Sequence, residues 1–263
     1  MIELTDFGGA SAAAQDYLKH IYTAETERAR SHEGHTPGAL VSTKDLARRL
    51  AVSAASATNM LKRLHNLGLV RHVPYQGAAL TDAGRKIALE VIRHHRLLET
   101  YLAEALGVSW DRVHEEAEVL EHFLSDHLED RISALLGHPT EDPHGHPIPA
   151  RDLVSPSLPA RRLSDVRAGE VALIAEVSDQ DSALLRYLAD LGLFPGVRVR
   201  VLQVAPFGGP ITLVLGGEDR AGVLGGEDRA GAPGEDGPGR EVAVGVEAAG
   251  QVFVEAVARG QTA

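Results

Sequence analysis

Residues 42–80 read STKDLARRLAVSAASATNMLKRLHNLGLVRHVPYQGAAL, a stretch with two helical patterns followed by an alternating one. Ser42 and Ser53 each precede a helical pattern, where a serine hydroxyl can accept a backbone N–H of the first turn. The second helix is expected to end at Gly68, because glycine readily adopts the left-handed conformation that follows many helices. Residues 69–80 alternate around a proline and a glycine, which predicts a two-stranded hairpin. Together these patterns predict a winged helix-turn-helix.

The second helix of this stretch presents residue types that suit a DNA groove. Small residues at its start would let the helix approach closely, Asn59 could bond adenine edges, and Lys62 could reach phosphates. Hydroxyl groups at the start of the preceding helix and Gln76 on the hairpin could contact the DNA backbone. The candidate DNA-binding residues are Ser42, Thr43, Ser53, Ala55, Ser56, Thr58, Asn59, Lys62, Arg63 and Gln76. The alternative is an ordinary three-helix packing with a solvated polar face.

The charge distribution also favours a nucleic-acid surface near the N-terminus. The chain has 263 residues and a formal net charge of −11, which by itself argues against a nucleic-acid partner. Residues 1–96, however, contain 13 Lys or Arg and 9 Asp or Glu, whereas residues 97–160 contain 3 and 13. The basic residues are therefore concentrated in the same region as the predicted winged helix-turn-helix.

Composition excludes several classes of protein. The chain has no cysteine, which excludes a disulfide scaffold, a thiolate zinc finger, an iron–sulfur cluster and a cysteine nucleophile. No apolar run approaches the roughly 18 residues that a membrane span needs, and the N-terminus lacks a signal-peptide pattern. We therefore expect a cytoplasmic protein without a membrane partner, in which any metal is held by histidines, carboxylates and carbonyls.

A run of histidines and glutamates in the middle of the chain predicts metal binding. Residues 110–136 are expected to form one long helix, and the offsets of its four potential ligands place them on one helical face. These ligands are His114, Glu118, Glu121 and His122. The preceding helix, expected over residues 81–106, adds His95 and Glu99 four residues apart. A solvated polar stripe is the alternative, and the other histidines, among them His94, His144 and His146, are interpreted as surface or loop residues.

Two other functions compete with DNA binding. A helical di-metal oxidase would need two Glu-x-x-His motifs, but residues 118–122 read EVLEH and place a glutamate where that motif needs a histidine. A metallohydrolase would need an open coordination position, and no nucleophile constellation is visible. We therefore expect no enzymatic activity, with a helical metalloenzyme or a metal buffer as the alternatives.

The C-terminal part of the chain changes to short β-type runs. They predict a small barrel and cover residues 171–177, 197–204, 211–215, 241–246 and 252–254, with a short helix at 182–190. The sequence LGGEDRAG occurs twice, at residues 215–222 and again at 224–231. We interpret this repeat as part of a disordered loop over residues 215–237.

The combination of these motifs resembles the diphtheria-toxin-repressor family of metal-dependent transcriptional regulators. The resemblance rests on residues 16–22, the reading helix from Ser53, residues 80–84, residues 93–99, residues 113–122 and residues 145–149. It implies a mainly α protein with small β elements: an N-terminal winged helix-turn-helix, a helical dimerisation domain and a C-terminal SH3-like barrel. The expected partners are a second copy of the chain and a palindromic operator in double-stranded DNA, with no small organic substrate.

The resemblance also implies two sets of metal ligands. The primary site falls on Asp16, Glu118, Glu121 and His122, and the ancillary site falls on His95, Glu99, His114, Glu176 and Asp179. Iron-type members have Met and Cys at the positions of Asp16 and Glu118, so the oxygen-rich primary site favours Mn(II), with Fe(II) as the alternative. Lys19 stands where the manganese branch uses a glutamate for a second, adjacent metal ion, so a binuclear cluster of that type is not expected.

The resemblance predicts three domains and a mechanism. The winged helix-turn-helix covers residues 1–80, the metal-binding and dimerisation domain covers 81–150, and the linker and SH3-like domain cover 151–263. A metal ion that bridges Asp16 and the dimerisation domain would give the two reading helices of the dimer a fixed separation. We expect a regulator of metal-homeostasis genes, usually a repressor of uptake, that responds to manganese or, alternatively, to iron.

Overall fold

The computed structural model describes residues 10–30, 40–152, 161–216 and 239–257. The chain divides into two compact units. The first contains residues 1–97, 118–140 and 148–156, and the second contains residues 98–117, 141–147 and 157–263. Most of the predicted repeat loop lies outside the described residues. Within the described residues, no helix combines the length and the apolar character needed to cross a membrane.

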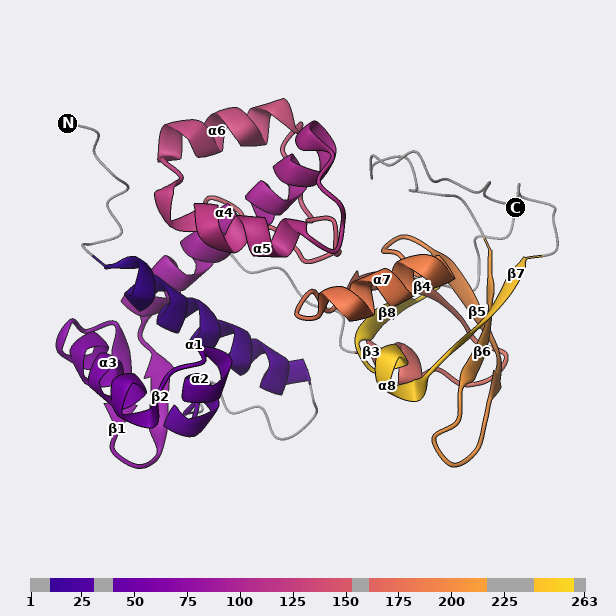
Figure 1. The fold of residues 1–263 in the computed structure, drawn as a ribbon, viewed down its shortest axis with the longest axis horizontal. Coiled ribbons are helices and arrows are strands. Elements are labelled where there is room, and N and C mark those ends of the chain that lie inside the picture. The colour runs from indigo at the N-terminus through magenta and orange to yellow at the C-terminus, as the bar shows by residue number, and fades with distance from the viewer. Residues whose placement is uncertain (1–9, 31–39, 153–160, 217–238, 258–263) are drawn as a thin grey trace. The chain divides into compact units, whose positions relative to one another are not determined.

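The first unit begins with the predicted winged helix-turn-helix (Figure 1). Its elements are α1 (Ala12–Arg30), α2 (Thr43–Arg49), α3 (Ala54–Asn66), β1 (Val70–Val73) and β2 (Gly77–Leu80). Ser42 and Ser53 cap α2 and α3 by accepting the N–H groups of Asp45 and Ser56, each at 3.1 Å, as predicted. The two helices and α1 share one core, to which Leu18, Ile21, Leu46, Leu61 and Leu64 contribute fully buried side chains.

The hairpin of the wing has a close approach that only glycine permits. Strands β1 and β2 pair antiparallel, with Val70 opposite Leu80 and Val73 opposite Gly77. Gly77 has φ +131°, and a Cβ atom there would lie 2.0 Å from the carbonyl oxygen of Val41. A bridge between Val41 and Ala78 joins the hairpin to the segment that precedes α2. The hairpin is present as predicted, and these contacts attach it to the segment that precedes α2.

The central helices differ from the prediction of one long helix over residues 110–136, which is wrong. After α4 (Asp82–Leu106) the chain forms α5 (Val113–Leu120), a 3₁₀ turn η1 (Glu121–Phe123) and α6 (Asp126–Leu135). Leu124 is extended, with ψ 121°, and Ser125 caps α6 by accepting the N–H of Leu128 at 3.4 Å. His114 and Glu118 therefore lie on α5, whereas Glu121 and His122 lie in the 3₁₀ turn that follows it, so the four predicted ligands do not belong to one α-helix.

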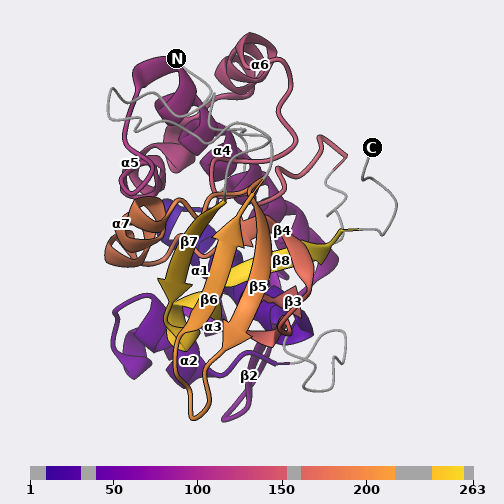
Figure 2. The same ribbon diagram turned by 90° about the vertical axis from the view of Figure 1, so that its right-hand side faces the viewer.

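The second unit contains an antiparallel six-stranded sheet with the order β3-β8-β4-β5-β6-β7. Its strands are β3 (Arg161–Arg162), β4 (Val171–Val177), β5 (Arg198–Val204), β6 (Ile211–Leu215), β7 (Arg240–Val244) and β8 (Val252–Ala256). Between these strands the chain forms two short helices, α7 (Ser182–Leu191) and α8 (Val246–Ala249), and the 3₁₀ turn η2 (Leu163–Asp165). Figure 2 shows β5, β6 and β7 side by side. The predicted SH3-like barrel is confirmed, with a core that includes Ile174, Leu185 and Leu213.

Candidate metal centres and nucleic-acid interface

The polar face of α3 is presented to solvent, while its apolar face packs in the core. Ala57, Leu61 and Leu64 are fully buried. Most of the candidate DNA-binding residues are exposed, namely Ser53, Ala55, Ser56, Asn59, Lys62, Arg63 and Gln76, and the partly buried ones are Ser42, Thr43 and Thr58. Ser42 and Ser53 already accept helix-capping hydrogen bonds, and the hydroxyl of Thr58 donates to the carbonyl of Ala54 at 2.8 Å. The polar face of α3 is therefore accessible to a partner, and the wing follows α3 directly in the chain.

Three of the four predicted primary-site residues come together in the first unit. The Nε2 atom of His122 in η1 lies 2.9 Å from Oδ1 of Asp16 in α1, although the two residues are far apart in the sequence. The same Nε2 atom lies 3.6 Å from Oε1 of Glu121, a residue with no exposed surface. Donor atoms of Asp16, Glu121 and His122 all lie within 4.8 Å of one another. The Nδ1 atom of His122 lies 2.6 Å from Oε1 of Gln15, which orients the imidazole ring.

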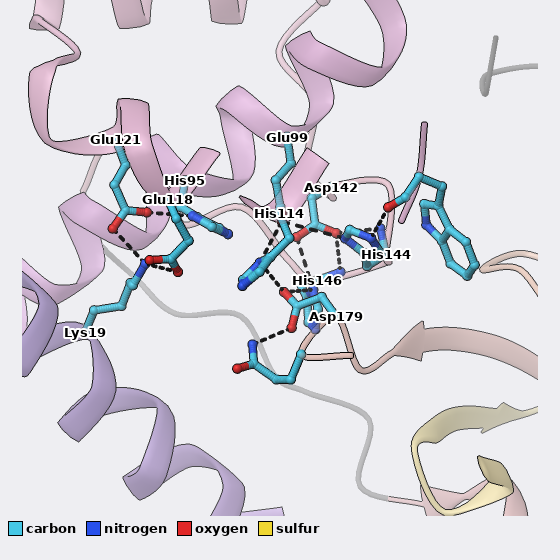
Figure 3. A network of polar contacts seen from close by, with 12 residues as sticks. Lys19, His95, Glu99, His114, Glu118, Glu121, Asp142, His144, His146 and Asp179 are labelled. Atoms are coloured by element: carbon cyan, nitrogen blue, oxygen red, sulfur yellow. Dashed lines mark hydrogen bonds and ion pairs between the residues drawn. The ribbon is translucent and has the colours of Figure 1, made fainter. Parts of the chain in front are cut away.

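Glu118, the fourth predicted residue, joins this group through Lys19 (Figure 3). The ammonium nitrogen of Lys19 lies 2.7 Å from Oε1 of Glu118 and 2.6 Å from Oε1 of Glu121. Burial favours the neutral amine, but the charges of Glu121 and Glu118 outweigh burial, so the pKa of Lys19 is raised. The two carboxylates therefore favour the charged form of the lysine.

His95, predicted for the ancillary site, contacts the same glutamate within the first unit. Its Nδ1 atom lies 2.5 Å from Oε2 of Glu121, opposite the oxygen that faces Lys19. Donor atoms of His95, Glu118 and Glu121 lie within 4.8 Å of one another. Both carboxylate oxygens of Glu121 thus have a nitrogen partner, which fixes the orientation of that side chain.

Three predicted ancillary-site residues come together in the second unit. The Nδ1 atom of His114 lies 3.2 Å from Oε1 of Glu99 and 3.4 Å from Oδ2 of Asp179. Burial lowers the pKa of His114, but hydrogen bonds and charges from Asp179 and Glu99 outweigh burial and raise it to about 10. Burial raises the pKa of Asp179, but the charge of His146 and the contact with His114 outweigh burial and hold it well below its usual range. The carboxylates of this group thus attract positive charge strongly.

The fifth predicted ancillary residue, Glu176, contacts a histidine that the sequence analysis did not assign. Its Oε1 atom lies 3.3 Å from Nε2 of His146, whose Nδ1 atom lies 3.2 Å from Oδ2 of Asp142 and 3.7 Å from Oδ2 of Asp179. Burial lowers the pKa of His146, but the Asp142, Glu176 and Asp179 carboxylates outweigh burial and raise it well above its usual value. Figure 3 shows His146 between Asp142 and Asp179.

The interpretation as surface or loop residues is wrong for His94, which is buried in α4, whereas His144 and His146 do lie in a loop but are not at the surface. His94 and His144 have no exposed surface, and the side chain of His146 is 12% exposed. The Nε2 atom of His94 lies 3.3 Å from Oε2 of Glu129, and Nε2 of His144 lies 3.0 Å from the carbonyl oxygen of Trp110. The spacing Asp-x-His-x-His at residues 142–146 was the available signal, but the surrounding proline and glycine residues pointed to a solvated loop.

Both groups have donor sets that fit a divalent cation. The primary group offers three carboxylates and one imidazole, which belong to Asp16, Glu118, Glu121 and His122. Oxygen donors combined with imidazole suit divalent metal ions such as Mn(II) and Fe(II). The ancillary group offers buried carboxylates and imidazoles in the second unit. In both groups, the negative charge of the carboxylates is balanced by a lysine ammonium or by imidazoles that can be protonated. A bound metal ion would supply this positive charge in their place.

Family models match three successive parts of the chain. The iron dependent repressor N-terminal DNA binding domain matches residues 10–78, and the iron dependent repressor metal binding and dimerisation domain matches residues 81–150. The FeoA domain matches residues 161–225. The three models therefore follow one another along most of the chain in the order expected from the sequence.

Curated relatives and solved structures agree with these models. The iron-dependent repressor IdeR of Mycobacterium tuberculosis (strain ATCC 25618 / H37Rv) is 34% identical over 215 residues, which are 77% of this chain and 88% of the relative. The diphtheria toxin repressor of Corynebacterium diphtheriae is 29% identical over 213 residues, which are 77% of this chain and 88% of that protein.

Among solved structures, a manganese-dependent transcriptional repressor in complex with manganese has a TM-score of 0.75 and 42% identity, covering 93% of this chain and 100% of its own. The manganese regulator SloR has a TM-score of 0.67 and 30% identity, covering 93% of this chain and 98% of its own. The family models, the curated relatives and these solved structures therefore all point to one group of proteins. The chain belongs to the iron-dependent repressor family, which includes the diphtheria toxin repressor, and is a metal-dependent DNA-binding transcriptional regulator.

Proposed function

We propose that this chain is a manganese-activated repressor of metal-uptake genes, acting in the cytoplasm as a homodimer on a palindromic operator. The observation that carries the proposal is the approach of Asp16 to His122 at 2.9 Å, which joins α1 to η1. The proposed primary ligands are Asp16, Glu118, Glu121 and His122. We assign no catalytic role to any of them.

Manganese is favoured by the chemistry of the primary donors. Three carboxylates and one imidazole form an oxygen-rich set, and carboxylate oxygens suit Mn(II). The two solved manganese regulators are similar along almost the whole chain, which supports the same choice. Fe(II) is the alternative, because the curated relatives include iron-dependent repressors and intrinsic affinity ranks Mn(II) below Fe(II).

The proposed mechanism depends on the position of α1. Leu18 and Ile21 of α1 lie in the same core as Leu61 and Leu64 of α3, so a fixed α1 also fixes the reading helix. Asp16 would anchor α1 to Glu121 and His122 through a shared cation, which supplies two positive charges to a group of carboxylates. In a homodimer the two α3 helices would then keep the separation of two operator half-sites.

The remaining parts of the proposal concern the domains and the second set of ligands. We propose a DNA-binding domain at residues 1–80, a metal-binding and dimerisation domain at 81–150 and a linker with an SH3-like domain at 151–263. His95, Glu99, His114, Glu176 and Asp179 are proposed as the ancillary ligands. The proposed DNA contacts are those of the α3 face, the start of α2 and the wing.

The test is operator binding by metal-stripped protein, titrated with Mn(II) and with anaerobic Fe(II) at fixed salt. We expect tight, sequence-selective binding to the upstream DNA of the chain's own gene only when Mn(II) is present. A Glu121→Gln variant should lose the response to Mn(II), whereas Glu115→Gln, which alters an exposed residue of α5, should keep it. Binding that ignores metal, or an unchanged response of Glu121→Gln, would refute the proposal.

A further inference from the structure

Gln15 precedes Asp16 in α1 and has a side chain that is enclosed by the protein. Among the described residues it is the only buried glutamine, with 3% of the residue exposed. A buried amide needs partners for its oxygen and for its nitrogen, and both are present. Oε1 lies 2.6 Å from Nδ1 of His122, and Nε2 donates to the carbonyl oxygen of Ala10 at 3.2 Å. One amide therefore joins the segment before α1 to η1 within the first unit.

The contact with Ala10 decides which way the amide of Gln15 faces. The two ends of a glutamine amide are nearly the same size, and hydrogen bonds determine which end holds the oxygen. The carbonyl oxygen of Ala10 can only accept, so the end of the amide that faces it is the nitrogen. The opposite orientation would place two oxygen atoms against each other with no hydrogen between them. Ala10 therefore turns Oε1 of Gln15 toward His122.

The orientation of Gln15 determines which nitrogen of His122 holds a hydrogen. The amide oxygen has no hydrogen to give, so Nδ1 of His122 is the donor in the contact of 2.6 Å. The other nitrogen, Nε2, is therefore the one that can offer a lone pair to a cation. It lies 2.9 Å from Oδ1 of Asp16 and 3.6 Å from Oε1 of Glu121. The ring thus directs its ligand nitrogen at the carboxylates of the primary group.

The first turn of α1 carries both side chains that contact the ring. Gln15 and Asp16 are consecutive residues, and each contacts a different nitrogen of His122. The N–H of Gln15 donates to the carbonyl oxygen of Ser11 at 3.0 Å, so the backbone of this turn is fixed. A movement of α1 away from η1 would break the contacts of both nitrogens at once. The orientation of the ring therefore depends on the helix that carries Asp16.

We propose that Gln15 is a positioning residue for the primary metal site, which keeps a hydrogen on Nδ1 of His122 and directs Nε2 at the cation. Gln15 supplies no ligand atom of its own. Partners of this kind fix the tautomer and the orientation of a ligand ring, and their loss typically lowers metal affinity by about 10- to 100-fold. This role rests on the proposed function only in so far as His122 is a metal ligand, and it does not depend on operator recognition.

The first test measures Mn(II) binding by metal-stripped, full-length protein without DNA, with the free ion followed by electron paramagnetic resonance. The binding step that His122→Gln weakens identifies the primary site in this titration. We expect Gln15→Leu, which has a similar volume but no acceptor, to weaken the same step by about 10- to 100-fold. Gln15→Glu keeps an acceptor oxygen for Nδ1 and should bind at least as tightly as the unaltered chain. Gln203→Leu, an exposed change on β5, should have no effect.

A second measurement observes the hydrogen on Nδ1 directly and would not respond to a merely structural role of Gln15. Protein with ¹⁵N-labelled histidines is loaded with Zn(II), a diamagnetic substitute for Mn(II), and its imidazole signals are recorded by NMR. The signals missing from His122→Gln are those of this ring. We expect Nδ1 of His122 to be protonated and slow to exchange with water, and Nε2 to be bound to the ion. In Gln15→Leu the Nδ1 hydrogen should exchange faster, because its acceptor is gone.

Several outcomes would overturn this role of Gln15 and leave the proposed function intact. They are Gln15→Leu that binds Mn(II) as tightly as the unaltered chain, Gln15→Glu that loses as much affinity as Gln15→Leu, and a Zn(II) ion bound through Nδ1 of His122. The NMR signals of the unaltered chain decide the question should a variant unfold. Unchanged Mn(II) binding by His122→Gln would instead refute both the role of Gln15 and the assignment of His122 as a primary ligand.

Discussion

The ammonium nitrogen of Lys19 in α1 lies 2.6 Å from Oε1 of Glu121 in η1, and both side chains are almost completely buried. The same nitrogen lies 2.7 Å from Glu118, so one lysine neutralises part of the group that is proposed to bind metal. The positive charge of the lysine thus holds α1 near η1 without a metal ion. A bound metal ion would compete with this ammonium for the same two oxygen atoms.

The first prediction concerns Lys19→Met. Removing one partner of a buried ion pair leaves uncompensated carboxylates and costs about 3 kcal/mol of unfolding free energy. We expect this loss in urea unfolding of metal-free protein, and we expect saturating Mn(II) to restore most of it, because the ion then balances Glu118 and Glu121. Lys44→Met, an exposed change on α2, is the control and should have no effect. Equal stability of the Lys19 variant and the native chain without metal would contradict this role.

The second prediction is a pH dependence at Glu129. Burial raises its pKa, but hydrogen bonds from His94 and Arg93 outweigh burial and lower it to about 2, against an ordinary value of 4.5. A depressed carboxylate pKa stabilises the fold above pH 4.5, and the contribution, about 3 kcal/mol, is lost as the pH falls from 4.5 towards 2. Glu129→Gln should therefore be less stable than the native chain at pH 7, and the difference should shrink over this acidic range. A difference that stays constant between pH 7 and pH 3 would show that the ionised carboxylate has no such effect.

The third prediction separates base recognition from phosphate contact on α3. Lys62→Ala should weaken binding to all DNA sequences and reduce the slope of log affinity against log salt by about 1, because one phosphate contact is lost. Asn59→Ala should cost about 1–3 kcal/mol on the preferred operator and little on unrelated DNA. Both are measured by fluorescence anisotropy at several salt concentrations with Mn(II) present. Lys86→Ala, an exposed change on α4, should leave the slope unchanged, and an unchanged slope in Lys62→Ala would exclude a phosphate contact by Lys62.

The fourth prediction compares two glycines with positive φ in the second unit. Gly145→Ala places a Cβ atom 2.0 Å from the carbonyl of Ala175, so strand β4 must shift and we expect a loss of about 3 kcal/mol. In Gly107→Ala the added Cβ atom meets no described atom within 4 Å. The loss of unfolding free energy should therefore be only the strain of alanine in the left-handed conformation, about 1 kcal/mol. Thermal unfolding of both variants checks the difference. Equal losses would mean that the loop at residues 141–147 yields easily and is not held against β4.

Several features followed from local sequence patterns because their causes lie within a few residues. Ser42 and Ser53 accept N–H groups only three residues ahead, so the starts of α2 and α3 were predictable. Five of the six described strands of the barrel were predictable from their apolar runs, apart from shifts of one or two residues at their ends, whereas the short strand β3 was not predicted. The long helix over residues 110–136 was the exception, because the apolar pattern hid the start signal at Ser125.

The candidate metal site likewise has features that follow from local sequence and features that depend on tertiary packing. The sequence by itself determined which residue types were available: carboxylates and histidines at helical spacing, a lysine in place of an acidic residue, and a polar reading helix. Only the tertiary structure decided that Lys19 lies between Glu118 and Glu121 and that His144 and His146 are buried among carboxylates. These contacts join segments separated by as many as 102 residues, and burial depends on how such segments pack. Neither is encoded in the spacing of neighbouring residues.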